Sequence, residues 1–229
     1  MRQTTVVIMN WARPGNVRKL VREIYQPHSS VAEIIVFDAA PPARRVSFDA
    51  DDTKVVHWVR ESGRDLGLVG RFAAAAMART TSVLLVDDDV VPVPPTIDQL
   101  VYIHEKFGGV IATQGRTLSA TGKYNITNAY GTVDVALTRA CCVSRSACAA
   151  SIEPLHRMMS ELPSAQPYGN GEDIVLSYAA RNQGEIVQAA ELPYKNINAD
   201  DEHAISVRFP GHIDHRTLAC AWCEKYFRT

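Results

Sequence analysis

The chain has no long apolar run and almost no net charge. Because no apolar stretch reaches about 18 residues, it offers no candidate for a membrane-spanning helix. It also has neither the pattern of a secretion signal nor a lipidation motif, so we expect a cytoplasmic protein. Its 24 basic and 25 acidic side chains leave a net charge of −1, and nothing in this balance indicates a nucleic-acid-binding surface.

Cysteine is scarce as well. There are five cysteines, an odd number, and Cys141 and Cys142 are neighbours within an apolar stretch. This pattern favours buried free thiols over a disulfide framework. Cys220 and Cys223 resemble half of a zinc knuckle, but no second Cys or His pair stands at the usual spacing.

What is present indicates one globular domain. The chain has 229 residues, of which 46% are apolar and 21% charged, so it can bury a sizeable core. No internal repeat, low-complexity tract or linker divides it, and we expect a single domain over residues 1–229.

Strands and helices alternate in the first half of the chain. Strands are expected at residues 4–9, 34–37, 54–59 and 83–86, and helices at 17–24, 65–79 and 97–107. The last of these helices is expected to begin with Thr96 as its N-cap, because three prolines just before it stop any extension. Such alternation predicts an α/β fold with a mostly parallel central sheet flanked by helices, and ligands at the carboxyl ends of its strands.

The second half is less regular. Residues 114–130 are polar, without a clear period, and are expected as a loop or hairpin on a candidate acceptor-facing surface. Strands are expected at 110–113, 133–143 and 186–188, and helices at 145–159 and 172–180. A last amphipathic helix is expected after the polar segment 194–215.

The most informative stretch is the apolar strand 83–86, which ends in Asp87, Asp88 and Asp89. Three adjacent carboxylates repel one another, and a bound cation would relieve this repulsion. Oxygen ligands favour Mg2+ or Mn2+, which proteins hold through one or two carboxylates while the ion bridges substrate phosphates. The triplet therefore indicates a nucleotide site; the alternative is a solvated acidic turn.

Other candidate residues follow the first two expected strands or open a later helix. Trp11, Arg13 and Asp38 follow the first two strands, so they are expected at the same edge of the sheet as the acidic triplet. Glu172 and Asp173 open a helix, where stabilisation of the helix dipole alone could also place two acids.

Four separated motifs carry a resemblance to a known family. Residues 7–13 resemble its first strand with its arginine, and residues 83–89 its Asp-Asp-Asp strand, with Arg71 at the family's spacing before it. Residues 170–174 resemble its Asn-x-acid-Asp-Ile motif, and His212 with Arg216 resembles its late His-x-x-x-Arg. In this order, the motifs are similar to those of a nucleotide-sugar glycosyltransferase of the GT-A type, and most similar to the exostosin family's C-terminal domain.

The resemblance implies how a donor would bind. Asp89 would be the direct ligand of Mn2+ or Mg2+, with Asp87 and Asp88 holding the ribose and the water around the metal, and Asp87 a second candidate metal ligand. Arg71 would neutralise phosphate or orient the triplet. The remaining donor-binding candidates are Trp11, Arg13, Asp38, Asn170 and His212. Residues 1–113 would form the nucleotide-binding half and residues 114–229 the acceptor-side half. The donor would be a nucleoside-diphosphate sugar, with UDP favoured over GDP, and the acceptor a glycan or another hydroxyl compound.

The catalytic residues implied are Asp173, Glu172 and Arg216. In a retaining transfer, Asp173 would stabilise an oxocarbenium-like transition state or act as the nucleophile; in an inverting transfer, it would be the general base. Arg216 would contact the diphosphate or the acidic pair. The resemblance favours a retaining hexosyl- or N-acetylhexosaminyltransferase.

Two other functions fit part of the pattern. Residues 86–91 also match the Asp-x-Asp signature of haloacid-dehalogenase-like phosphatases, although three expected strands precede it and no downstream Lys motif accompanies it. A non-catalytic nucleotide-sugar binding module is the other alternative. The chain differs from the exostosin family in lacking a stem and in having Gly171 where a cysteine can occur, and both features fit a cytoplasmic enzyme.

Overall fold

The centre of the fold is an eight-stranded sheet in the order β3-β2-β1-β4-β10-β6-β11-β8. The computed structural model describes residues 3–25, 30–48, 55–59, 67–162, 170–197 and 211–228. The strands of this sheet are β1 (Thr4–Asn10), β2 (Val31–Asp38), β3 (Val55–Val59), β4 (Ser82–Val86), β6 (Val110–Ala112), β8 (Gly131–Thr132), β10 (Ala140–Ser144) and β11 (Val187–Ala189). β1 to β4 pair in parallel, whereas β10 runs antiparallel to both β4 and β6. The expected α/β fold with a mostly parallel central sheet is confirmed.

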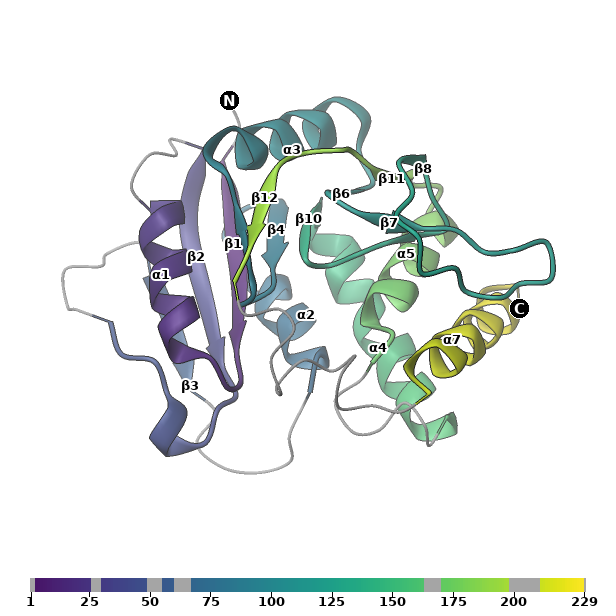
Figure 1. Ribbon diagram of the computed structural model, residues 1–229, viewed down its shortest axis with the longest axis horizontal. Helices are drawn as coiled ribbons and strands as arrows, with labels where there is room; N and C mark the ends of the chain where they lie inside the picture. Colours follow the sequence, from purple (N-terminus) through teal and green to yellow (C-terminus); the bar gives the residue numbers. More distant parts are fainter. Residues whose placement is uncertain are drawn as a thin grey trace.

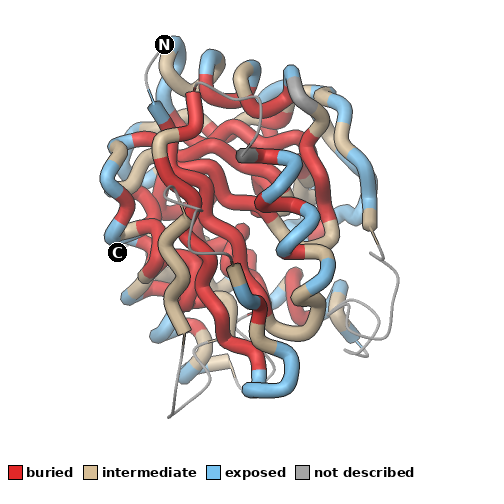
Figure 2. The backbone as a smooth tube through the Cα atoms, turned by 90° about the vertical axis from the view of Figure 1, so that its left-hand side faces the viewer, coloured by how far each residue is buried: buried red, intermediate tan, exposed pale blue. Residues whose placement is uncertain are grey.

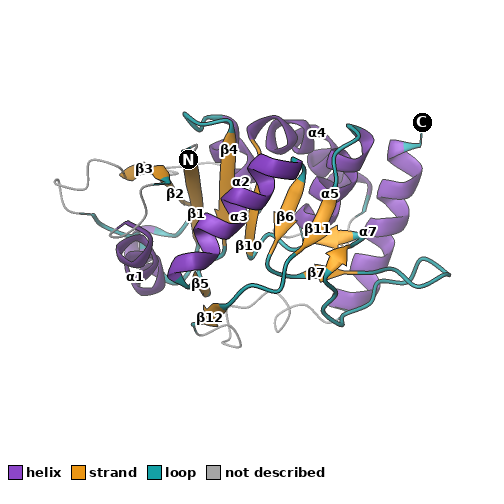
Figure 3. Cartoon of the chain, turned by 90° about the horizontal axis from the view of Figure 1, so that it is seen from above, coloured by secondary structure: helices purple, strands orange, loops and turns teal. Residues whose placement is uncertain are grey.

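Helices cover both faces of this sheet (Figure 1 and Figure 3). They are α1 (Pro14–Tyr25), α2 (Val69–Ala76), α3 (Pro94–Phe107), α4 (Arg145–Glu161), α5 (Glu172–Asn182) and α7 (His212–Phe227). Val6 and Ile8 of β1 pack in one buried cluster with α1 and α3. Val7 and Met9 belong to the other cluster, with α2, α4, α5 and α7. Alternate residues of a strand point to opposite faces, so the two cores lie on either side of the sheet. Its central strands, such as β1 and β4, are buried, whereas β3 and β8 at its edges are not (Figure 2).

Two small sheets complete the second half of the chain. β5 (Val90–Pro92) pairs with β12 (Tyr194–Asn196), and β7 (Gly115–Arg116) pairs with β9 (Val135–Ala136). A further bridge joins Leu118 to Tyr124, so the expected loop or hairpin at 114–130 is partly a hairpin. These small sheets are the smaller β region beside the main sheet.

The expected start of the helix at 97–107 was wrong. α3 begins at Pro94, and its N-cap is Val93 rather than Thr96. A proline fits the first helical turn because the missing N–H has no partner there in any helix. Thr96 instead donates a hydrogen bond from Oγ1 to the carbonyl of Pro193, at 2.6 Å.

The expected strand at 133–143 was too long. The structure divides it into β9 and β10, which are separated by residues 137–139. Within this separating turn, the carbonyl of Arg139 accepts a hydrogen bond from the amide of Asp87, at 3.0 Å. The break in the apolar segment therefore brings the turn against the acidic triplet. The expected helix at 65–79 is also shorter, because α2 spans Val69–Ala76, and the first two expected residues lie outside the described part.

Three further observations concern membrane helices, cysteines and metal ligands among the described residues. No described helix is long and apolar enough to cross a membrane. All five cysteines are buried and free, which confirms the expectation of buried thiols. In the described ranges no group of three or more His, Cys, Asp and Glu side chains could hold a metal ion on its own.

Candidate active site

The acidic triplet lies at the carboxyl end of β4, and its backbone is fixed at both ends. The amide of Asp87 donates to the carbonyl of Arg139, at 3.0 Å, and the amide of Ile197 donates to the carbonyl of Asp89, at 2.7 Å. The second bond continues the pairing of β5 with β12. A segment more than a hundred residues away in the sequence therefore holds the loop that carries the carboxylates.

Each carboxylate of the triplet faces a different arginine. Asp87 Oδ1 lies 2.6 Å from Arg71 Nη2, and Asp88 Oδ1 lies 2.7 Å from Arg13 Nη1. Asp89 is paired much less closely, because its Oδ1 is 3.6 Å from the nearest nitrogen of Arg139. That oxygen is buried and has no hydrogen-bond partner among the described residues. Asp89 is thus the carboxylate with an oxygen left for a ligand.

Burial makes the negative charges of the triplet costly. It raises the pKa of Asp88 to about 7, an effect that Arg13 opposes and that Asp87 and Asp89 reinforce. The pKa of Asp89 is raised by burial first and by Asp87 second. A divalent cation would offset these costs, and the buried oxygen of Asp89 without a partner fits an ion of this kind. No group of three or more described His, Cys, Asp and Glu side chains could hold a metal. An ion at Asp89, with Asp87 as the second candidate ligand, would therefore take its remaining ligands from water and substrate oxygens.

A second acidic pair begins α5. Gly171 is the N-cap of this helix, with φ at 113°, a conformation that other residues rarely adopt. The following residues, Glu172 and Asp173, are both buried. Helix-dipole stabilisation would place acids at an exposed helix start, but it does not explain why both are buried beside arginines.

Arg71 connects the triplet to this second pair. It lies in α2, with 4% of its surface exposed, and its Nη1 is 3.7 Å from Glu172 Oε1 while Nη2 bonds Asp87. Glu172 Oε1 also accepts a hydrogen bond from Thr138 Oγ1, at 2.9 Å. Burial, together with the charge of Asp173, raises the pKa of Glu172 to about 7. A single buried guanidinium thus holds the two acidic groups at one site.

Asp173 forms an ion pair with Arg216 of α7. Their closest atoms, Asp173 Oδ2 and Arg216 Nη2, are 2.5 Å apart, and each side chain is 6% exposed. Arg216 also donates to Asn170 Oδ1, at 3.3 Å, and its guanidinium carbon lies 4.6 Å from the centre of the Tyr124 ring. Asn170 and Arg216 are therefore brought to the second acidic pair, as the late motifs predict.

His212 lies one turn before Arg216, at the start of α7. Burial first, and the charge of Arg216 second, lower its pKa to about 4. The imidazole is therefore neutral at neutral pH. Of the two predicted late residues, Arg216 pairs with the acids, and His212 lies beside it as a neutral group.

The N-terminal candidates divide into two groups. Trp11 and Arg13 follow β1, and Arg13 reaches Asp88. Asp38, by contrast, is fully buried and accepts hydrogen bonds from Asn10 Nδ2 and from the amides of Ala40 and Val46. His57 Nε2 lies 3.1 Å from it as well. The Asp38 carboxylate is thus occupied by its neighbours, and the structure does not bring it to the acidic triplet.

The structure adds three residues that the sequence did not single out, namely Tyr124, Thr138 and Arg139. Tyr124 packs on Arg216, Thr138 bonds Glu172 and Arg139 approaches Asp89. No local pattern marks them, because each comes from a segment expected only as loop or strand.

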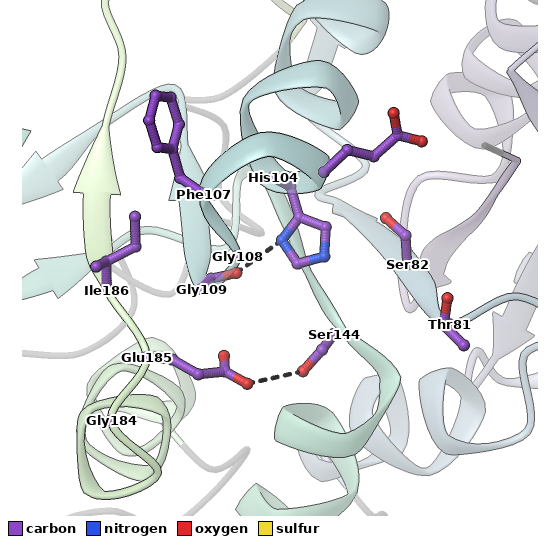
Figure 4. A pocket seen from close by; sticks show the side chains of 11 residues that line it. Thr81, Ser82, His104, Phe107, Gly108, Gly109, Ser144, Gly184, Glu185 and Ile186 are labelled. Atoms are coloured by element: carbon purple, nitrogen blue, oxygen red, sulfur yellow. Dashed lines mark hydrogen bonds between the residues drawn. The ribbon is translucent and has the colours of Figure 1, made fainter. Parts of the chain in front are cut away.

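A separate cavity of about 410 Å3 lies elsewhere (Figure 4). It is lined by Thr81 and Ser82 at the amino end of β4, by the end of α3 with His104, and by Glu185. Within it His104 Nδ1 pairs with the carbonyl of Gly109, at 2.8 Å. None of the predicted site residues lines this cavity.

Comparison with solved structures shows the fold. A mannosyltransferase from Pyrobaculum calidifontis, PcManGT, in complex with GDP-Man and Mn2+, matches with a TM-score of 0.59 and 14% identity, over 99% of this chain and 71% of that one. GalNAc-T7 with UDP, GalNAc and Mn2+ matches with a TM-score of 0.56 and 12% identity, over 85% of this chain. The match spans only 43% of the GalNAc-T7 chain. Both neighbours have the GT-A fold, as expected for this chain.

Comparison of sequences shows the family. No curated protein matches significantly. The model of the glycosyl transferase family 64 domain, however, matches residues 4–228, and these include both acidic groups and all four arginines that face them. This match leaves the phosphatase alternative without support, and the chain belongs to glycosyl transferase family 64.

Proposed function

We propose that this glycosyltransferase moves a hexosyl or N-acetylhexosaminyl group from a nucleoside-diphosphate sugar to a hydroxyl group of a glycan. The observation that carries the proposal is Arg71, which joins Asp87 of the triplet to Glu172 of the second pair. In this arrangement the donor diphosphate would bind at the triplet, which we call the diphosphate end of the site. The reacting sugar would lie at the second acidic pair, which we call the catalytic end. The two structural neighbours, whose complexes contain UDP or GDP-Man together with Mn2+, support this class of donor.

At the diphosphate end, Asp89 and Asp87 would hold Mn2+ or Mg2+. A cation there would act as a Lewis acid on the departing diphosphate. Arg13 and Asp88, which form an ion pair, would orient the nucleoside with Trp11. Residues 1–113 would then form the nucleotide-binding half, with UDP favoured over GDP, and residues 114–229 would form the acceptor-side half.

At the catalytic end, the ion pair with Arg216 favours retention of the anomeric configuration. A guanidinium at 2.5 Å stabilises the charged carboxylate of Asp173 and fixes the direction of one oxygen. A fixed negative charge suits stabilisation of an oxocarbenium-like transition state, or attack as a nucleophile. In an inverting enzyme, Asp173 would instead be the general base that accepts the acceptor's proton. The four motifs of the sequence, not this ion pair, are the basis on which we extend the relationship to exostosin-like enzymes.

Donor binding tests this proposal. We expect UDP or GDP to bind the wild-type protein in the presence of Mn2+ and to bind far more weakly after chelation with EDTA. Asp89→Ala should have the effect of chelation, because it removes the carboxylate with the unpartnered oxygen. Glu23→Ala, which changes an exposed acid of α1, is the matched control and should bind as the wild type does.

Isothermal titration calorimetry measures the nucleotide affinity of the wild-type protein with Mn2+, of the wild-type protein after chelation, and of each of the two variants with Mn2+. If Asp89→Ala binds both nucleotides with unchanged affinity, the metal assignment is wrong. Tight binding of a nucleotide sugar with neither hydrolysis nor transfer would instead favour the non-catalytic binding module.

A further inference from the structure

Arg139 lies between the acidic triplet and the small β sheets. Its Nη1 donates to Gln114 Oε1, at 3.2 Å, and its Nη2 donates to Asn196 Oδ1, at 2.7 Å. The same Nη2 is 3.6 Å from Asp89 Oδ1, which is too long for a hydrogen bond. Both hydrogen-bond acceptors of this guanidinium are therefore neutral amides.

The other arginines of the site are bound differently. Arg71, Arg13 and Arg216 each bond a carboxylate at 2.5 to 2.7 Å. Breaking such a buried pair leaves a carboxylate without its counter-charge, which is costly. Arg139 has two amide partners, and its other contacts are the Asp89 carboxylate at 3.6 Å and the Tyr194 ring, whose centre is 5.7 Å from the guanidinium carbon. Leaving neutral amides costs less than breaking a buried charge-assisted pair, so of these arginines Arg139 can turn to an incoming anion with the least disturbance.

The side chain of Arg139 is also placed and free enough to do this. It is 26% exposed, whereas those of Arg71 and Arg216 are 5% and 6% exposed. Its carbonyl is held by the Asp87 amide, so the backbone is fixed, and its side chain is the most exposed of the four arginines. Asp89 is the proposed ligand of the cation that carries the diphosphate, and a group 3.6 Å from Asp89 is next to that leaving group.

We propose that Arg139 binds the diphosphate of the donor, and that without a donor it partly neutralises Asp89. This inference rests on the proposed function and assigns the charge of the leaving group to a residue outside the family motifs. Guanidinium groups bind phosphate oxygens in a bidentate manner. When the cation and diphosphate bind, Arg139 would give up Gln114 and Asn196 for phosphate oxygens, while Asp89 would exchange the guanidinium for the cation.

The proposal predicts effects of opposite sign for Arg139→Gln. Mn2+ alone should bind about two- to fivefold more tightly, because a cation that competes for Asp89 is removed. UDP or GDP in saturating Mn2+ should bind about tenfold to a hundredfold more weakly, because charge-assisted hydrogen bonds to the diphosphate are lost. Electron paramagnetic resonance of free Mn2+ measures the first affinity, and calorimetry measures the second.

Two further variants make the test specific. Arg116→Gln removes an arginine of the adjacent β7 that bonds Gly115 and Asn128 rather than an acid, and it should change neither affinity. Arg139→Lys keeps the charge without the bidentate geometry, so its nucleotide affinity should lie between those of the wild type and Arg139→Gln.

The outcomes distinguish a failure of the role proposed for Arg139 from a failure of the proposed function. If Arg139→Gln weakens both Mn2+ and nucleotide, the residue is structural and the inference is wrong; unchanged nucleotide affinity refutes it equally. Neither result affects the proposed function. If the wild-type protein binds no nucleotide with Mn2+, the proposed function fails, and the inference then fails with it.

Discussion

Removing one partner of the ion pair between Asp173 and Arg216 should be among the most destabilising single changes in the second half of the chain. Each side chain is 6% exposed, and their closest atoms are 2.5 Å apart. Asp173→Asn leaves Arg216 buried without its main counter-charge, and removing one partner of a buried pair costs about 3 to 5 kcal/mol. We expect the lower end of this range, because Glu172 also attracts Arg216 and supplies part of the missing charge.

The double variant tests the origin of this cost. Removing both charges with Asp173→Asn and Arg216→Gln leaves no uncompensated ion, so the free energy of unfolding should fall by less than the sum of the two single changes. A coupling energy of at least about 2 kcal/mol is expected for groups in direct contact within one network. Urea unfolding followed by circular dichroism gives the free energies of all four proteins.

An exposed pair provides the control. Arg157 and Glu161 of α4 are 2.7 Å apart, but their side chains are 54% and 46% exposed. Solvent screens such a pair, and its double-mutant cycle should show no coupling beyond experimental error. If the Asp173–Arg216 cycle is additive to within about 0.5 kcal/mol, the reasoning about the buried pair is wrong.

Two other predictions concern Glu172 and a glycine outside the site. Since the pKa of Glu172 is raised from 4.5 to about 7, its ionisation destabilises the folded protein as the pH rises between these values, and the penalty is complete above them. Glu172→Gln should therefore gain up to about 3 kcal/mol relative to the wild type between pH 5 and pH 8, and a difference in melting temperature that does not change with pH would contradict this. Gly109→Ala should lower the free energy of unfolding by more than about 2 kcal/mol, because the added Cβ would lie 2.2 Å from the carbonyl oxygen of Ile186. Gly122→Ala has a similar positive φ and nothing within 4 Å, so it should lose only about 1 kcal/mol, and equal losses in urea unfolding would refute the steric argument.

The sequence predicts most of the main sheet because its strands are buried on both faces. A continuous apolar run such as 83–86 is typical of a strand that lies between two layers of helices. In the helices between the strands, apolar residues recur every three to four positions, as expected for one buried face. The same reasoning misplaced the start of α3, since prolines that stop a helix in its interior are well tolerated in its first turn. It also joined β9 and β10, because the turn at Thr138 and Arg139 interrupts an apolar segment without a glycine or proline.

The candidate site was predictable where several carboxylates are adjacent in the sequence. Asp87 and Asp89 stand out because adjacent carboxylates at the end of an apolar strand repel one another, whereas the role of Asp173 came from the family resemblance. Asp38 stood out because it follows an apolar strand, but only the structure shows that its carboxylate is occupied by local hydrogen bonds.

Arg139 could not be found from the sequence. Its partners Gln114 and Asn196 come from segments that are distant in the sequence, 25 and 57 residues away, and a lone arginine in a turn is most often a surface cation. The contact with Asp89 exists because β10, which Arg139 directly precedes, pairs with β4, whose carboxyl end carries the triplet.

The most direct test of the central claim is the hydrolysis of a nucleotide sugar by the wild-type protein and by Asp173→Asn, at a temperature where both are folded. Calorimetry on the same samples gives the affinity for the donor in Mn2+. We predict an affinity within a few fold of wild type and a turnover lower by roughly two to four orders of magnitude. Nuclear magnetic resonance of the released sugar should show the anomeric configuration of the donor retained. If Asp173→Asn turns over at the wild-type rate, Asp173 is not at the reacting carbon and the account of this site is wrong.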